Sequence, residues 1–307
     1  MCSLRKTRTA FTLIELLTVV AIIVILIAVL VPALSQARIK AQETASLASI
    51  KNIEQGLELF RADPVNKGQY PPSHNPDSPL AGQSGGNAKS YTGANWLSDA
   101  LMGPENLGWD PRATSPLSKQ IAWAQTASEI RRINPYVAPD SVRVERDIDV
   151  GSQVSRYWDR YPNDARVIVD NSFFDPELNG LNHAILYYRA NPAAQSTWGL
   201  AAGSTVAPGK LIYDHSDNTR IIERQPIAVN PTSSPLLAVS GNVPNAADTT
   251  LTPGSFYEFI QDREVAQLVQ QGNTLIRRPS RPGSFLLISP GLDGLYGTND
   301  DITNFRN

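Results

Sequence analysis

An uncharged apolar segment near the start of the chain constrains everything that follows it. The segment runs from Leu16 to Leu34, and only Thr18 and Pro32 interrupt its aliphatic and alanine residues. Its length is close to the ~20 residues that an α-helix needs to cross a bilayer. Basic residues at positions 5–8 precede it, and Glu15 lies at its edge. A carboxylate in such a segment costs free energy, so it indicates a functional role.

Two familiar kinds of N-terminal segment fit parts of this pattern. A secretory signal peptide has a shorter apolar region, a small-residue cleavage site and no acidic residue, and here cleavage after Ala37 would suit it. A signal anchor would keep the basic residues 5–8 in the cytoplasm under the positive-inside rule. It accounts for the hydrophobicity and orientation of the segment, but it gives no role to Glu15.

The residues around Glu15 carry a third interpretation. Residues 10–16 read AFTLIEL, and they resemble the class III signal of type IV pilins and type II secretion pseudopilins. In that family a dedicated prepilin peptidase cuts before the phenylalanine on the cytoplasmic side and then methylates its new amino group. The resemblance implies a leader peptide at residues 1–10, a cleavage site between Ala10 and Phe11, and an N-methylated Phe11. The family usually has glycine before the cut, where this chain has Ala10.

Glu15 and Pro32 also match positions of that family. Its glutamate lies four residues after the phenylalanine, as Glu15 follows Phe11, and a proline is common where Pro32 stands. At this spacing Phe11 and Glu15 share one helix face, about 6 Å apart along the axis. The resemblance implies that Glu15 pairs with the terminal amine of a neighbouring subunit and so sets the register of an apolar helix bundle. The alternative is a glutamate that reaches the lipid headgroups.

The sequence after the apolar segment predicts that the helix continues. Residues 35–62 are rich in Ala, Gln, Glu and Lys, and their apolar residues recur mostly at three- and four-residue steps, an amphipathic helical pattern. Asp63-Pro64 ends it, because proline disfavours a helical residue before it. We therefore predict one long helix over residues 11–63, roughly 78 Å long, with residues 11–34 spanning a membrane. Pro32 should kink or loosen this helix locally.

Composition excludes several classes of function. The chain has 307 residues and a net charge of -2, so we expect no nucleic-acid partner, because such proteins usually carry a basic patch or stripe. The only cysteine is Cys2, so disulfides could not stabilise an exported head. The histidines at positions 74, 183 and 215 lie far apart, and no Walker loop, nucleophile elbow or dinucleotide fingerprint is present. We therefore expect that the protein is not an enzyme.

The rest of the chain, residues 64–307, predicts a globular periplasmic head. A Pro-, Gly- and Ser-rich stretch over residues 71–93 predicts a surface loop, and a short helix follows it and ends near Gly103. A Gly-x-Tyr-Pro turn before such a helix resembles the secretion pseudopilins, and here it is residues 68–71. Residues 104–240 show an irregular pattern, which we interpret as a family-specific elaboration of the head.

Short apolar runs predict an antiparallel sheet in this head. The clearest strands are Ala184–Arg189 and Ser284–Ser289, with a short helix at Glu264–Gln271 between them. Further strands are predicted at Val142–Val144, Arg166–Val169, Lys210–Tyr213 and Arg220–Glu223. Residues 214–218, between the last two, predict a hairpin turn. The expected fold class is therefore α+β and pilin-like, with the amphipathic half of the long N-terminal helix packed on the antiparallel β-sheet.

The C-terminal loop, residues 289–302, gathers aspartates and glycines. Its sequence SPGLDGLYGTNDDI follows a predicted strand, and Ca²⁺ prefers carboxylate and carbonyl oxygens. The loop lacks the alternating acids and closing glutamate of an EF-hand, but it resembles the C-terminal calcium loop of the major type II secretion pseudopilins. That resemblance implies Ca²⁺ ligands at Asp293 and Asp301, a third carboxylate at Asp300, and oxygens from Leu292 and Thr298. The other interpretation is a pair of solvated Asp-Gly turns.

The resemblance implies that the protein is a structural subunit of a type II secretion pseudopilus. Such a subunit is processed by the prepilin peptidase and methyltransferase and held in the inner membrane by one span, with its head in the periplasm. It polymerises with itself and with other pseudopilin subunits on an inner-membrane assembly platform, and this growth drives protein export. Because the filament's tip subunit lacks the glutamate in that family, Glu15 argues against that position. Two other functions stay open: a minor type IV pilin with a binding or adhesive head (adhesion or DNA uptake), and a membrane-anchored protein that never polymerises.

Overall fold

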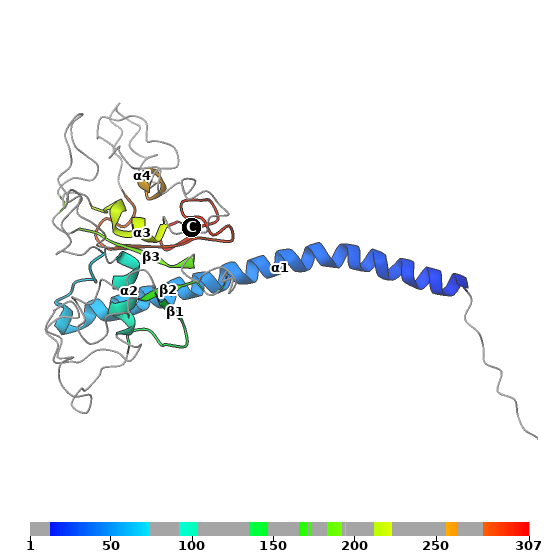
Figure 1. Cartoon of the computed structure of the whole chain (residues 1–307), viewed down its shortest axis with the longest axis horizontal. Helices are drawn as coiled ribbons and strands as arrows, with labels where there is room; N and C mark the ends of the chain where they lie inside the picture. The colour runs from blue at the N-terminus through cyan, green and yellow to red at the C-terminus, as the bar shows by residue number, and fades with distance from the viewer. Residues whose placement is uncertain are drawn as a thin grey trace, which may run out of the picture. The chain divides into compact units, whose positions relative to one another are not determined.

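The structure is a computed structural model, and it divides into two compact units, residues 1–44 and 45–307 (Figure 1). It describes residues 13–73, 92–103, 135–146, 166–170, 172, 183–191, 194, 212–222, 256–262 and 279–306. The expected leader and cleavage site, residues 1–11, and the predicted helix Glu264–Gln271 lie outside the described residues.

Helix α1 spans Leu13–Ala62, and it is the only described element of the first unit. The helix continues through Pro32 without a break in its assignment. It ends at the 3-10 turn η1, Pro64–Asn66, where the proline was expected to stop it. The Phe60 carbonyl, near the end of the helix, accepts a 2.7 Å hydrogen bond from the Asn66 side chain in addition to the Asp63 N–H at 3.3 Å, so this terminal carbonyl is satisfied. The prediction of one long helix is confirmed from Leu13 onward.

The described strands of the head are all antiparallel to their neighbours. They are β1 Arg143–Arg146, β2 Arg166–Val169, β3 Leu186–Arg189, β4 Phe285–Ser289 and β5 Ile302–Thr303. Strand β1 pairs with β2, while β3, β4 and β5 form a second ladder in that order. A bridge between Val169 and Ala184 joins the two ladders, and the Ile185 N–H donates a 2.8 Å hydrogen bond to the Ile168 carbonyl. The order across the head is therefore β1-β2-β3-β4-β5, and the α+β prediction is confirmed.

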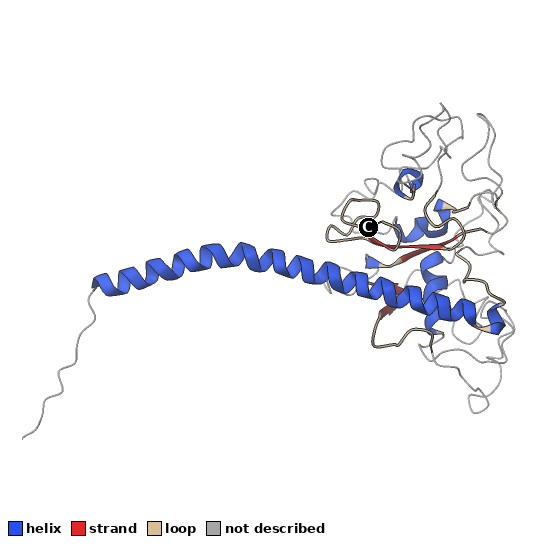
Figure 2. Ribbon diagram, turned by 180° about the vertical axis from the view of Figure 1, so that it is seen from behind, coloured by secondary structure: helices blue, strands red, loops and turns tan. Residues whose placement is uncertain are grey.

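One face of the sheet packs against the second half of α1 (Figure 2). Side chains alternate between the two faces of a strand, and Tyr187 of β3 and Leu287 of β4 point to this one. The helix supplies its buried residues at three- and four-residue steps, namely Ile50, Ile53, Leu57 and Phe60. The amphipathic pattern after the apolar segment is thus explained by burial against the sheet.

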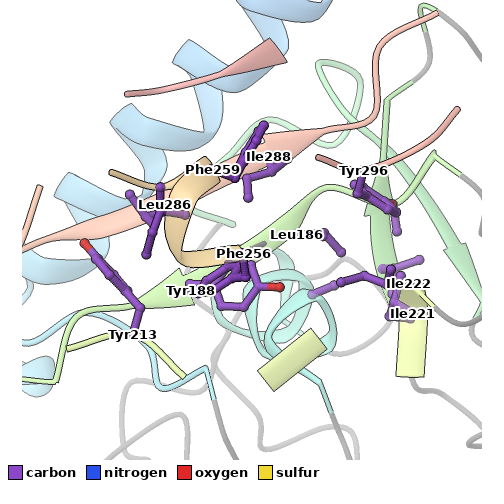
Figure 3. Packing of buried hydrophobic residues seen from close by; sticks show 14 of the residues in the cluster. Leu186, Tyr188, Tyr213, Ile221, Ile222, Phe256, Phe259, Leu286, Ile288 and Tyr296 are labelled. Carbon is purple, nitrogen blue, oxygen red and sulfur yellow. The ribbon is translucent and has the colours of Figure 1, made fainter. Parts of the chain in front are cut away.

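The opposite face of the sheet is also buried. It carries Leu186 and Tyr188 of β3 and Leu286 and Ile288 of β4 (Figure 3). Two short helices, α3 (Thr219–Ile222) and α4 (Phe256–Phe259), cover it with two isoleucines and two phenylalanines. Because both faces of the sheet are covered, β4 reads in sequence as a continuous apolar run rather than an alternating one.

Helix α2, Gly93–Met102, is the short helix predicted after the loop, and it is buried along its whole length. Thr92 caps its N-terminus, and the Thr92 and Asn95 side chains form a reciprocal capping box. Gly103 closes the other end with a φ of 68°, and its N–H donates a 3.0 Å hydrogen bond to the Asp99 carbonyl. These local contacts fix both ends of the helix.

Gly93 is the point of closest approach between α2 and β3. A Cβ atom there would lie 2.0 Å from the Tyr187 carbonyl oxygen and 2.9 Å from Asn218 Nδ2. We therefore expect Gly93→Ala to lower the free energy of unfolding by roughly 2–3 kcal/mol, because backbone atoms must move to admit the methyl group. Urea unfolding of the detergent-solubilised chain measures this. Gly283→Ala is the matched control, since nothing lies within 4 Å of its added Cβ, and equal stability of the two variants would contradict the prediction.

Two of the strand predictions were wrong. The described part of Lys210–Tyr213 forms a bend, and α3 occupies the position of the predicted strand Arg220–Glu223. The expected hairpin turn between them is the 3-10 helix η6, His215–Asn218. The reason is tertiary: the last residue of η6 binds α2 and β3 through its side-chain amide. The two successive isoleucines of α3 are then both buried in one cluster, which a strand with alternating faces does not allow.

Candidate functional site

The first half of α1 presents an apolar surface on all sides. Its large aliphatic side chains are exposed from Leu13 to Leu34. This helix is long and apolar enough to serve as a single membrane span or as a signal sequence. An exposed apolar surface of this extent is costly in water.

Glu15 lies in the first turn of α1, where the helix dipole favours a negative charge. The Thr18 Oγ1 donates a 3.0 Å hydrogen bond to the Glu15 backbone carbonyl. Ala10 and Phe11, the cleavage-site residues, lie outside the described part of the chain. The pairing of Glu15 with the amine of a neighbouring Phe11 therefore stays a prediction, as does a functional role for Pro32.

Asp170 forms a buried polar contact between α1 and the sheet that the sequence did not reveal. Its carboxyl group accepts hydrogen bonds from Ser46 Oγ of α1, from Ser289 Oγ of β4 at 2.6 Å, and from the Ser172 N–H at 2.9 Å. Asp170, Ser46 and Ser289 are all fully buried. Ser46 is also the first buried residue of α1, so this cluster fixes the point at which the helix joins the head.

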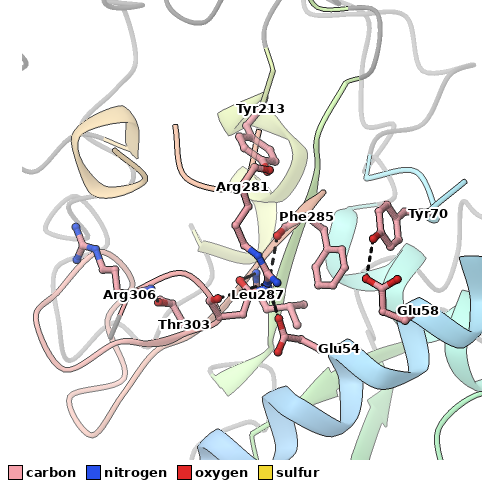
Figure 4. Close-up of polar contacts among 10 residues, drawn as sticks. Glu54, Glu58, Tyr70, Tyr213, Arg281, Phe285, Leu287, Thr303 and Arg306 are labelled. Atoms are coloured by element: carbon pink, nitrogen blue, oxygen red, sulfur yellow. Dashed lines mark hydrogen bonds and ion pairs between the residues drawn. The ribbon is translucent and has the colours of Figure 1, made fainter. Parts of the chain in front are cut away.

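A second polar contact joins α1 to the C-terminal segment (Figure 4). Glu54 forms an ion pair with Arg281 and accepts a 3.0 Å hydrogen bond from Asn304 Nδ2. Asn304 also receives the Leu287 N–H at 2.9 Å, next to the end of the β4–β5 ladder. The residue that follows the acidic loop and β5 is thereby tied to the helix.

The Gly-x-Tyr-Pro turn packs back on the end of α1, as Figure 4 also shows. The Tyr70 hydroxyl donates a 2.7 Å hydrogen bond to Glu58 Oε1, and Arg61 Nη1 donates to the same hydroxyl at 3.0 Å. The carbonyl of Pro71 accepts the Tyr187 hydroxyl at 2.6 Å. The turn therefore connects the helix end to β3, which gives a structural role to the motif noticed in sequence.

The acidic loop between β4 and β5 brings its five predicted ligand residues together. Asp300 Oδ2 accepts the Asp293 N–H at 3.0 Å, while Thr298 Oγ1 lies 2.6 Å from Asp300 Oδ1 and 3.1 Å from Asp301 Oδ1. Leu292 meets Asp300 through a backbone hydrogen bond, and its side chain is exposed. The arrangement is a compact set of hard oxygen atoms, and the His183 ring lies beside the loop at Gly294.

Two glycines of this loop adopt a left-handed backbone. Gly294 has a φ of 69° and Gly297 a φ of 90°, a region that L side chains rarely enter. At Gly291 an added Cβ would come within 2.2 Å of the Asp300 carbonyl oxygen. All three glycines are therefore required by the path of the loop, whether or not it holds an ion.

The three carboxyl groups differ in pKa. Burial raises the pKa of Asp301 to about 8, although the Gly297 N–H hydrogen-bonds to it at 2.7 Å. Burial also raises the pKa of Asp293. Burial acts in the same direction on Asp300, but hydrogen bonds from Thr298 and from the Asp293 backbone outweigh it and lower the pKa of that carboxyl group. The loop thus concentrates acids that repel each other when all are ionised.

These residues offer atoms that suit a cation, but the structure does not arrange them as a coordination site. Carboxylate and carbonyl oxygens are the donors that Ca²⁺ prefers, and the three aspartates supply the first kind. Within the described residues, no three His, Cys, Asp or Glu side chains are arranged to hold a metal ion. A bound cation would have to draw Asp293, Asp300 and Asp301 away from their present backbone contacts. Calcium binding therefore stays a prediction.

Comparisons of the chain with family models, with curated proteins and with solved structures found no match.

Proposed function

We propose that this protein is a structural subunit of a type II secretion pseudopilus. In this proposal the prepilin peptidase removes residues 1–10, and the new N-terminal helix holds the subunit in the inner membrane with its head in the periplasm. The subunit then polymerises through that helix with itself and with other pseudopilins on the membrane assembly platform. The observation that carries the proposal is α1: one uninterrupted helix, apolar and exposed in its first half, and packed on an antiparallel sheet in its second half.

The exposed half of α1 supports polymerisation as well as anchoring. Lipid and a bundle of like helices can both cover an aliphatic surface, because neither leaves apolar side chains in water. The same helix could therefore move from bilayer to filament core without losing its apolar surroundings. Glu15 would supply the direction and register that such a featureless surface lacks, since a buried carboxylate requires a nearby positive group.

Contacts between α1 and the head would make the head move together with the helix. Two polar contacts, at Asp170 and at Glu54, fasten α1 to the sheet and to the C-terminal segment in addition to the apolar packing. The Asp170 contact is buried, so the loss of one of its partners costs about 1–3 kcal/mol, whereas the Glu54–Arg281 ion pair is partly exposed and contributes about 0–1 kcal/mol. A helix held in this way would carry its head along when it is extracted from the membrane.

The N-terminus of the mature protein tests this proposal most directly. Mass spectrometry of the protein purified from its native membrane is expected to find a chain that begins at Phe11 with one methyl group on its amine. A chain that still begins at Met1, or one that begins at Arg38 after cleavage behind Ala37, would contradict the proposal. The second outcome would identify the apolar segment as a secretory signal peptide.

A minor type IV pilin with a binding head is the second candidate. The observation in its favour is the covered second face of the sheet, where α3 and α4 add a layer to the head. Pull-down of assembly partners by the full chain separates the two: secretion pseudopilins favour the first candidate, and type IV pilus components favour the second. A protein that remains monomeric in the membrane would favour neither.

Calcium binding by the acidic loop is a separate prediction within this proposal. Ca²⁺ titrated into the detergent-solubilised chain is expected to raise the free energy of unfolding of the head, by about 2.7 kcal/mol when the ion is at a hundredfold excess over its Kd. Asp293→Asn should remove most of this gain, because it takes one anionic donor from the loop. Mg²⁺ serves as the control, since it demands a tighter octahedral geometry. Equal stability with and without Ca²⁺ would contradict the calcium prediction and leave the filament proposal intact.

A further inference from the structure

Arg38 lies where α1 leaves the apolar segment. It is the first charged residue after Glu15, and no acidic residue lies between Glu15 and Glu43. At 1.5 Å per residue it is about 6 Å beyond Leu34 along the helix axis. The headgroup layer on each side of the hydrocarbon core is of the same thickness, roughly 5–8 Å. If α1 spans the membrane as proposed, Arg38 therefore lies at the level of the lipid phosphates.

Arg38 is exposed, and its guanidinium group can bind a partner from outside the chain. Its side chain is exposed, and within the described part of the chain no hydrogen bond or ion pair engages its guanidinium group. The neighbouring cation, Lys40, differs in this respect, because its Nζ lies 2.6 Å from Glu43 Oε2. One basic side chain at this level is thus already compensated by an acid of the same helix, and the other is not.

We propose that Arg38 binds the phosphate of an anionic phospholipid in the leaflet that faces the head. This inference rests on the proposed membrane span of α1, and it names the lipid chemistry that this span would contact. A guanidinium group presents paired N–H donors that match two phosphate oxygens, and it is less strongly hydrated than an ammonium group. Charge complementarity favours an anionic headgroup over a zwitterionic one, since the latter brings its own cation to the same layer.

The consequence for the protein is a fixed resting depth of the helix. The aliphatic side chains of residues 13–34 can slide along the bilayer normal at small cost. A contact between Arg38 and a phosphate would limit that sliding, because it keeps the first polar turn of α1 at the interface. The subunit would give up this contact when its helix leaves the bilayer.

Lipid selectivity of the full chain in vesicles tests the proposal. The vesicles contain phosphatidylcholine and phosphatidylglycerol, and electron spin resonance compares how strongly spin-labelled forms of the two lipids associate with the protein. The wild-type chain is expected to favour phosphatidylglycerol, and Arg38→Gln to reduce its relative association constant by up to about fivefold. Arg38→Lys should keep most of the preference. The basic residues 5–8 contribute equally in every variant, so the difference reports on position 38.

Lys51→Gln is the matched control. Lys51 lies about 26 Å beyond Leu34 on the same helix, is exposed, and like Arg38 has no side-chain partner among the described residues. An equal loss in Lys51→Gln, or no loss in Arg38→Gln, would overturn the proposal. The proposal would also be overturned if Arg38→Gln lost its lipid preference only at a high protein-to-lipid ratio. Dilution in lipid separates the protein copies, so such a result would mean that Arg38 binds an acidic residue of another copy. Extraction of the vesicles with alkaline carbonate distinguishes failure of the membrane span from failure of the Arg38 contact. A chain that is released from the vesicles contradicts the membrane span itself. A chain that is retained but shows no lipid preference contradicts only the role of Arg38.

Discussion

Glu15→Ala is expected to abolish filament assembly while the protein remains in the membrane. In the proposed filament the Glu15 carboxylate pairs with the N-terminal amine of a neighbouring subunit inside an apolar bundle. Removing one partner of a buried ion pair leaves the other charge uncompensated, at a cost of about 3–5 kcal/mol. Each subunit contact would then weaken by roughly two to four orders of magnitude. Electron microscopy of sheared filaments and chemical crosslinking of subunits measure the loss.

Glu15→Ala should make membrane insertion more favourable, in contrast to its effect on assembly. A carboxylate near the end of an apolar segment makes transfer into the bilayer less favourable, and alanine removes that cost. The Glu15→Ala protein should therefore resist carbonate extraction at least as well as the wild type. A variant that is lost from the membrane as well as from filaments would show that Glu15 acts in targeting and not in assembly.

Glu43→Gln is the control for this prediction. Glu43 is an acid of the same helix, but it lies in a surface pair with Lys40, whose side chain is 79% exposed. Exposed pairs of this kind contribute about 0–1 kcal/mol, so its loss should leave assembly unchanged. Normal filaments from Glu15→Ala, or a matching defect in Glu43→Gln, would contradict the role given to Glu15.

The sequence predicted the elements whose causes are local. Helix α1 follows from aliphatic and helix-favouring residues with a proline stop, and α2 was expected from the resemblance of residues 68–71 and 100–103 to the secretion pseudopilins, with its capping box and closing glycine seen in the structure. Strands β3 and β4 follow from short apolar runs rich in residues that favour strands. In each case the information lies within a few residues of the element itself.

The sequence did not predict the contacts that depend on distant residues. Residues 219–222 have the composition of a strand, yet the side chain of Asn218 and burial over the sheet make them a helical turn. The partners of Asp170 lie 124 and 119 positions away in the chain, at Ser46 and Ser289. No pattern of spacing reveals such a contact, because only the folded sheet and helix bring the three side chains together.

That contact gives the largest expected effect on stability. Asp170→Ala would leave the fully buried hydroxyl groups of Ser46 and Ser289 and the partly buried N–H of Ser172 without this acceptor. Each unsatisfied buried donor costs about 1–3 kcal/mol, although small movements and water relieve part of this. We expect the free energy of unfolding to fall by about 3–4 kcal/mol, measured by urea unfolding of the detergent-solubilised chain. Asp170→Asn should cost less, because an amide oxygen in the Oδ2 position still accepts both serine hydroxyl groups.

Single changes on the two serines separate the helix contact from the strand contact. Ser46→Ala and Ser289→Ala should each cost about 1 kcal/mol, and Ser46→Ala should cost much less once Asp170 is already alanine. Ser49→Ala is the matched control on the same helix, since the Ser49 hydroxyl donates only to the Ala45 carbonyl one turn before it, at 3.2 Å. Independent effects of Asp170 and Ser46 in this double-mutant cycle would show that their hydrogen bond contributes nothing.

Hydrogen exchange then distinguishes a general loss of stability from a local release of the helix. Ser46 is the first buried residue of α1, and Ile50 is the next. If the Asp170 cluster fixes the point where the helix joins the head, Asp170→Ala should speed exchange at residues 45–49 more than at residues 56–60, where apolar packing persists. Gly93→Ala, which destabilises the head from α2, should accelerate both segments alike. A uniform rise in Asp170→Ala would mean that this carboxyl group stabilises the head as a whole and does not hold the helix at Ser46.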